Sequence, residues 1–222
     1  DSFDIQDATT SVTLDGAVTT ETTAAINSGG TLTQNASVTA GSSVDYDAAT
    51  IGINNTITSG TTTDIDATGV TTVAEAGDIT AGGAVTFGAN KSGTLTTAGE
   101  ITTSDDNVTF TNAMTLQGDV EIATGSGAGN ILFSSTVATG DKDLQLDAGS
   151  GGNITAASSI TGGGAMTVVD GAVQQYSGAI SVDSLNIQDA TTSVTLDGAV
   201  TTETTLDINS GGTLTQNASV TA

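Results

Sequence analysis

The chain has 222 residues and a net charge of −23, because 25 residues are acidic and only two, Lys91 and Lys142, are basic. Phosphate binding depends on Lys and Arg, so this composition excludes nucleic acid as a partner. No apolar run is long enough for membrane insertion. The chain lacks His and Cys, which the common pairs of nucleophile and base in enzymes require. We therefore predict a protein that is not an enzyme and needs no organic cofactor.

Thr and Gly dominate the composition, with 45 and 29 residues, whereas Leu, Ile, Val and Phe together contribute only 47 of the 222. So few apolar residues with so high a net charge are typical of a disordered chain. Here, however, the apolar residues recur at regular intervals. A disordered chain has no need for such regular spacing. The sequence therefore predicts a folded repeat protein.

Residues 1–40 begin the chain with a segment that returns almost unchanged as residues 183–222, with 36 of 40 positions identical. The exceptions are Phe3/Leu185, Asp4/Asn186, Ala24/Leu206 and Ala25/Asp207. Successive side chains of a strand point to opposite faces, so the apolar positions 3, 5, 24 and 26 should face inward, and positions 4 and 25 outward. We expect one continuous domain over 1–222, in which 1–182 form one long repeat and 183–222 begin the next.

A shorter unit, roughly 20 residues long and so within the range of solenoid repeats, recurs along the chain. A Val or Ile followed by a small polar residue marks it at Val18-Thr19, Val38-Thr39, Ile57-Thr58, Ile79-Thr80, Ile101-Thr102, Ile160-Thr161, Ile180-Ser181, Val200-Thr201 and Val220-Thr221. Alternating apolar pairs lie between these marks, at Ala24/Ile26, Val44/Tyr46, Val85/Phe87, Leu144/Leu146, Met166/Val168, Leu185/Ile187 and Leu206/Ile208. Such alternation predicts short strands, and the Gly- and Asn-rich stretches between them predict tight corners.

One such unit cannot bury its apolar side alone, whereas stacked units pair each strand with the equivalent strands above and below. The sequence therefore predicts an all-β fold, a parallel β-solenoid (β-helix) of roughly 20 residues per coil. The general preference of parallel crossovers predicts right-handed coils. The small polar residues that follow each marked Val or Ile should form one outward column, rich in threonine.

The number of coils is ambiguous between Ile101 and Leu146. Phe87, Phe110 and Phe133 are equally spaced and could form a stacked aromatic ladder, but the next apolar pair arrives early, at Leu144/Leu146. Alternatively, "NAMTL" at 112–116 resembles "GAMTV" at 164–168 and places the irregularity elsewhere. The long repeat therefore contains either nine coils, one of them short, or eight coils, one of them with an insertion.

The short apolar pairs and the stretches "GNI", "NVTF", "LQLDAGSGGNIT" and "VTLDGAVTT" resemble the repeat regions of large bacterial surface proteins of the filamentous-haemagglutinin type. The resemblance covers essentially the whole chain, although the secretion domain at the N-terminus of that family is not in this sequence. It implies a right-handed β-helical shaft outside the cell, which holds adhesive or effector regions away from the surface.

Four carboxylates are the strongest candidates for a binding site. In Asp45-Tyr46-Asp47 and Asp64-Ile65-Asp66, one coil apart, Tyr46 and Ile65 should point inward, so that the four Asp side chains share one outer face. Like charges stacked at ~4.8 Å repel each other unless a cation lies between them, and Ca²⁺ prefers carboxylate oxygens. The alternative is a hydrated acidic face with diffuse counterions.

The candidate acceptors of N-glycosylation are asparagines that precede x-Ser/Thr, namely Asn35, Asn54, Asn107, Asn153 and Asn217. In a chain so rich in Ser and Thr, chance alone also produces several such matches.

Taken with the resemblance, these features predict a structural component of an extracellular fibre or cell-surface filament, a rod of tandem 182-residue repeats. Its partner is another copy of itself, by covalent continuation or by end-to-end or lateral assembly. The chain starts at Asp1 without a signal peptide, as expected of a segment processed from a longer array. The alternative function is a Ca²⁺-dependent adhesin module that binds a glycan or a surface through its acidic face.

Overall fold

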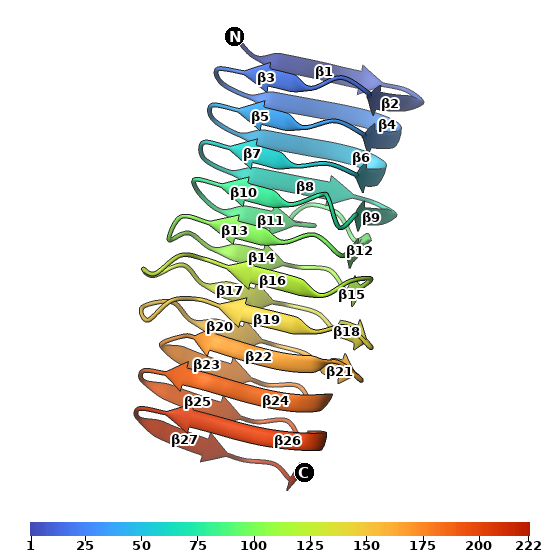
Figure 1. Ribbon diagram of the computed structural model, residues 1–222. Coiled ribbons are helices and arrows are strands. Elements are labelled where there is room, and N and C mark those ends of the chain that lie inside the picture. The colour runs from blue at the N-terminus through green and yellow to red at the C-terminus, as the bar shows by residue number, and fades with distance from the viewer.

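The computed structural model describes all 222 residues as one parallel β-solenoid without a helix (Figure 1). Descending from the N-terminus, the chain runs from left to right on the far side of Figure 1 and returns from right to left on the near side. This sense of winding makes the solenoid right-handed. The predicted fold class is therefore confirmed. No segment forms a helix that is both long and apolar enough to cross a membrane.

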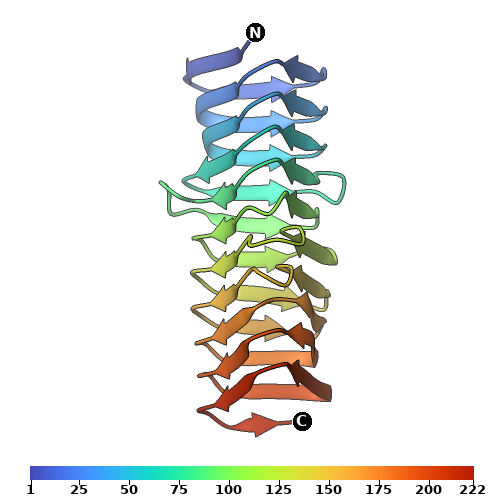
Figure 2. The same cartoon turned by 90° about the vertical axis from the view of Figure 1, so that its left-hand side faces the viewer.

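Each coil contributes strands to three faces of an elongated prism (Figure 2), which we name faces I, II and III in the order in which the chain visits them. Face I consists of β1 (Phe3–Ala8), the first parts of β4 (Ala24–Gln34) and β6 (Val44–Ile53), β8 (Thr63–Ala67), β11 (Val85–Phe87), β14 (Val108–Phe110), β17 (Ile131–Phe133), β20 (Ile154–Ala156), β23 (Val173–Tyr176), β25 (Ser193–Leu196) and β27 (Thr213–Gln216).

Face II consists of β2 (Ser11–Leu14), the last parts of β4 and β6, β9 (Val70–Val73), β12 (Thr94–Thr97), β15 (Met114–Leu116), β18 (Val137–Gly140), β21 (Ile160–Gly162), the first parts of β24 (Ile180–Ala190) and β26 (Val200–Ser210), and β28 (Val220–Thr221). Face III consists of β3 (Val18–Thr20), β5 (Val38–Ala40), β7 (Ile57–Ser59), β10 (Ile79–Ala81), β13 (Ile101–Thr103), β16 (Val120–Ala123), β19 (Leu144–Asp147), β22 (Ala165–Asp170) and the last parts of β24 and β26.

The core runs along the axis of the prism as a single cluster of 48 buried apolar residues. Inward and outward positions alternate along each strand, as the comparison of the two copies predicts. Ala24 and Ile26 are buried, Phe3 and Ile5 in the first coil are half-buried, and Asp4 is exposed. The period of two therefore identifies the inward residues correctly.

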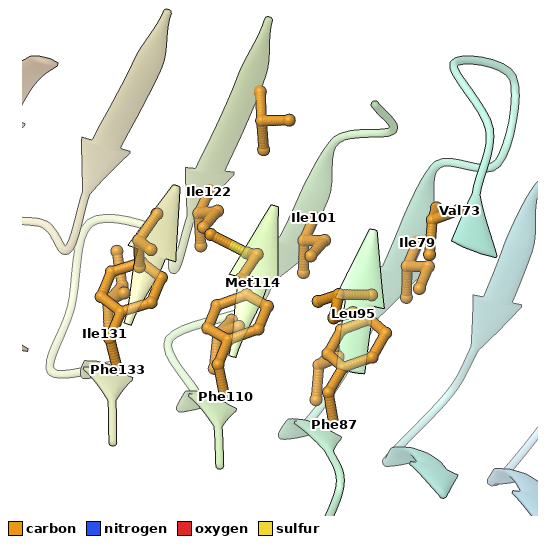
Figure 3. Packing of buried hydrophobic residues seen from close by; sticks show 14 of the residues in the cluster. Val73, Ile79, Phe87, Leu95, Ile101, Phe110, Met114, Ile122, Ile131 and Phe133 are labelled. Carbon is orange, nitrogen blue, oxygen red and sulfur yellow. The ribbon is translucent and has the colours of Figure 1, made fainter. Parts of the chain in front are cut away.

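The predicted aromatic ladder is present in the core (Figure 3). The ring centroids of Phe87 and Phe110 lie 5.4 Å apart with planes inclined by 9°, and those of Phe110 and Phe133 lie 5.0 Å apart with planes inclined by 7°. The three rings come from adjacent strands of face I, in register. The interval between the three phenylalanines is thus the length of a coil in this part of the chain.

The predicted single threonine column is wrong, because its members lie on two different faces. Thr19, Thr39, Thr58, Thr80 and Thr102 stack on face III. Thr161, Ser181, Thr201 and Thr221 stack on face II. The motif of a β-branched residue followed by Thr fits either face, so its recurrence does not show which face it occupies.

The coil count between the two copies falls between the two predicted integers. Along face I, eight coils separate Phe3 from Gln174. The chain then passes face II at Ile180 and reaches face III at Leu185, which is the copy of Phe3. The interval from one copy to the next therefore spans eight and two-thirds coils.

Candidate functional site

The four aspartates predicted as a cation site lie together on the outer surface of face I. The register of β6 and β8 places Asp45 beside Asp64 and Asp47 beside Asp66. Tyr46 and Ile65 between them point into the core and are 0% and 1% exposed. With Asp4, Asn27 and Asn90, among other residues, the four aspartates line a surface cavity of about 320 Å³. The alternation of side chains in two stacked strands thus brings the candidate residues together.

Protein donors compensate one of the two stacked pairs, Asp47 and Asp66. Lys91 Nζ donates a hydrogen bond to Asp47 Oδ1 and forms an ion pair with it. The backbone N–H of Asn90 donates to both carboxylate oxygens of Asp66, at 3.2 Å each, and Asn90 Nδ2 donates to Asp66 Oδ2 at 2.7 Å. The corner at residues 88–93, between β11 and β12, therefore covers this pair, and Asp66 is only 4% exposed.

This corner does not belong to the predicted site. Lys91 reaches back to Asp47, two coils away, and a periodicity of one coil does not predict a contact that skips a coil. The only signals in the sequence are that Lys91 is one of two basic residues and that "GANKSG" is an unusually long corner.

The other stacked pair, Asp45 and Asp64, has no cationic partner. Burial raises the pKa of Asp64 to about 6, and the neighbouring carboxylates Asp66 and Asp45 add to this effect. Burial and the charges of Asp47 and Asp66 also raise the pKa of Asp45. The Oδ1 atom of Asp64 is buried without a hydrogen-bond partner. This pair therefore contributes negative charge to the cavity that no basic side chain compensates.

Acidification should stabilise this part of the solenoid. Between the unfolded pKa of Asp64, about 3.9, and its folded pKa of about 6, the folded state binds more protons, so stability rises as the pH falls from 7.5 to 5. Asp64→Asn should raise the free energy of unfolding at pH 7.5 by roughly 1 kcal/mol, less than the shift alone implies because water reaches the pair, and should weaken the pH dependence. Thermal unfolding followed by circular dichroism at both pH values measures both effects.

The control for this prediction is Asp207→Asn, which removes the same charge at an exposed position. Acidification also lowers the overall repulsion of a chain with net charge −23, and the control variant retains that general effect. An equal pH dependence in both variants would contradict a specific role of Asp64.

The donor set suits a hard cation, but the side chains are not arranged around one. Ca²⁺ binds six to eight oxygen ligands, and carboxylate oxygens are among those that it prefers. As the side chains stand, no three acidic residues are placed to hold one metal ion. Any cation held here would therefore lie between Asp45 and Asp64 and complete its coordination with water.

The asparagines predicted as glycosylation acceptors lie at corners of the prism. Asn35 Nδ2 donates to Asp15 Oδ1 at 2.8 Å, and Asn54 Nδ2 donates in turn to Asn35 Oδ1 at 2.9 Å. In the second copy, Asn217 Nδ2 donates to Asp197 Oδ1 at 2.7 Å. A sugar on any of these three amide nitrogens would replace one of its N–H donors.

The remaining two acceptors belong to a second ladder, which continues through Asn130. Asn107 Oδ1 accepts hydrogen bonds from the backbone N–H of Asn130 at 2.9 Å and from Asn130 Nδ2 at 2.8 Å. Asn130 Oδ1 accepts from the backbone N–H of Asn153, and Asn153 Oδ1 from that of Val173. These amides satisfy backbone donors at the corners, a role indicated by the equal spacing of Asn107, Asn130 and Asn153.

The chain matches no family model, no curated protein sequence and no solved structure. The resemblance to bacterial adhesin repeats therefore stays a prediction from composition and periodicity. Function is inferred below from the geometry of the solenoid.

Proposed function

We propose that this chain forms part of the shaft of an extracellular fibre or cell-surface filament, a non-catalytic rod built from tandem 182-residue repeats. The parallel β-solenoid is compatible with such a shaft, because coils can be added along its axis without changing its cross-section. The two nearly identical copies within the chain support the tandem arrangement.

One pair of equivalent residues carries this proposal. Leu32 and Leu214 occupy the same position in the two copies, but Leu32 is 0% exposed and Leu214 is 48% exposed. Leu32 is covered by Ile51 of the following coil, and Leu214 stacks on Val194 of the preceding coil. Full burial of a leucine contributes about 1.5–3 kcal/mol. A further coil stacked on β27 would therefore be stabilised by the same contact that buries Leu32.

The contacts between the second copy and the coil before it support the same proposal. Residues 183–202 repeat residues 1–20 except at two positions, and the preceding coil covers them through Met166 on Leu185 and Ile180 on Val200. A preceding repeat would cover residues 1–20 through the same contacts. The chain thus contains, immediately before its second copy, the segment that would cover its own first coil in a tandem array.

Electron cryo-microscopy of the native assembly tests the proposed function. We expect filaments whose power spectrum shows a meridional spacing of ~4.8 Å between coils. Eight and two-thirds coils at this spacing give a repeat of about 42 Å along the axis. Discrete particles without this repeat would contradict the tandem shaft.

A second candidate function is a Ca²⁺-dependent adhesin module that binds a glycan or a surface. The unpartnered Oδ1 of Asp64, stacked on Asp45, is the observation that favours it. Calorimetric titration with Ca²⁺ at pH 7.5 decides between a discrete site and a diffuse counterion atmosphere. Saturable binding that Asp64→Asn abolishes supports the adhesin module, and heat no greater than that of dilution excludes it.

A further inference from the structure

We infer that consecutive 182-residue repeats are rotated relative to each other by one third of a turn about the solenoid axis. Each feature of the repeat would therefore appear on all three sides of the shaft in succession. This inference rests on the proposed tandem continuation. The rotation itself, which moves equivalent residues from one face of the prism to another, is already present between the two copies within this chain.

The same sequence lies on different faces of the prism in the two copies. Ile5 stacks on face I, whereas its copy Ile187 stacks on face III. Val12 lies on face II, whereas its copy Val194 lies on face I. All three faces thus accept the same residues, because each requires only inward apolar side chains that alternate with small polar ones.

The contacts between successive coils are nevertheless conserved between the copies. Gly30 lies against the carbonyl of Thr10, and its copy Gly212 lies against the carbonyl of Thr192. The first contact is at the corner between faces I and II, and the second is at the corner between faces III and I. The stacking of neighbouring coils is therefore local, and it is indifferent to the face on which it occurs.

The change of phase occurs in the middle of the repeat, where the position of the longest corner changes. Residues 88–93 form the long corner between faces I and II. The next long corners, at residues 124–130 and 148–153, lie between faces III and I. The fractional coil count thus coincides with a displacement of the long corner from one edge of the prism to another.

Three repeats are needed before a feature returns to the same side. At eight and two-thirds coils each, three repeats complete a whole number of coils and about 125 Å of shaft at ~4.8 Å per coil. In a tandem array the aspartate-lined cavity would face a new side at intervals of about 42 Å. Cations or surfaces recognised by this cavity could therefore be engaged from any direction around the rod.

Pairs of nitroxide spin labels test the phase in the chain as it is, because the sequence has no cysteine of its own. The structure stacks Ala123 on Asp147 on face III and places Ala138 on face II. If the repeat instead held nine coils, one of them short, Ile122 would stack on Val137, and Ala123 on Ala138. The informative variants are Ala123→Cys/Asp147→Cys and Ala123→Cys/Ala138→Cys, with Ala138→Cys/Thr161→Cys as a positive control that stacks in both registers.

Labels on directly stacked positions should show strong dipolar broadening of the electron paramagnetic resonance spectrum, as ~4.8 Å separates the strands. We expect broadening for the Ala123/Asp147 pair and the control, and none for the Ala123/Ala138 pair. The reverse result, or broadening in the control alone, would overturn the fractional phase. Because this measurement requires no filament, failure to find filaments would count against the tandem shaft without affecting the phase.

Discussion

Phe110→Ala should lower the free energy of unfolding by about 3–5 kcal/mol. Phe110 is 1% exposed and lies between the rings of Phe87 and Phe133 in the middle of the solenoid. Its removal leaves a cavity that neither neighbouring ring can fill without leaving the register of its own strand. The loss also removes both stacking contacts of the ladder, each worth about 0.5–1.5 kcal/mol beyond the burial of area.

Denaturation with urea, followed by circular dichroism, measures this loss. Thr109→Ala is the matched control, because it changes the adjacent residue of the same strand on the outward side, and its cost should be within about 0.5–1 kcal/mol of zero. Equal losses in the two variants would mean that the aromatic ladder is not part of the packed core.

The sequence predicts the fold because inward apolar residues recur at every second position of the strands. The pattern separates Ile26 from Ala25, and Tyr46 from Asp45 and Asp47, without any knowledge of the chain's path. The spacing of the phenylalanines likewise predicts a stack, since equal coil lengths place equal residues above each other. These predictions require only the period of two and the length of a coil.

The same sequence does not predict which face a strand occupies. The Val18-Thr19 and Ile160-Thr161 motifs look equivalent, yet the first lies on face III and the second on face II. All three faces are built from short strands with inward apolar residues, and Gly-rich stretches such as residues 88–93 and 124–130 do not indicate which faces they join. The fractional coil count therefore becomes visible only when strand pairing is known.

The sequence likewise predicts one part of the acidic site and not the other. Alternation within two strands predicts that Asp45, Asp47, Asp64 and Asp66 share a surface, and the structure confirms it. The partners of Asp47 and Asp66 come from a corner whose conformation has no period, so the sequence does not assign Lys91 and Asn90 to the site. Local periodicity thus predicts the carboxylates but not the groups that compensate them.

Gly30→Ala should be the most damaging single methyl addition among the corners of the first coils, with a loss of at least about 2–3 kcal/mol. A Cβ at Gly30 would lie 1.2 Å from the carbonyl oxygen of Thr10, so the backbones of two coils would have to separate. Gly16→Ala is the control, because a Cβ at Gly16 meets no atom within 4 Å. Thermal unfolding of both variants measures the difference, and a similar melting temperature for both would contradict the close stacking of coils.

The control residue also tests the tandem shaft, because its copy has a different environment. Gly198 occupies the position of Gly16 in the second copy, and a Cβ there would lie 2.1 Å from the carbonyl oxygen of Gly178 in the coil above. Gly198→Ala should therefore be destabilising, whereas Gly16→Ala should be neutral in this chain. In a chain extended at its N-terminus by residues 1–182, the coil containing Gly178 would cover the original Gly16, and the same substitution should become destabilising. If Gly16→Ala remained neutral in the extended chain, the first coil would not accept a preceding repeat, and the proposed continuation would be wrong.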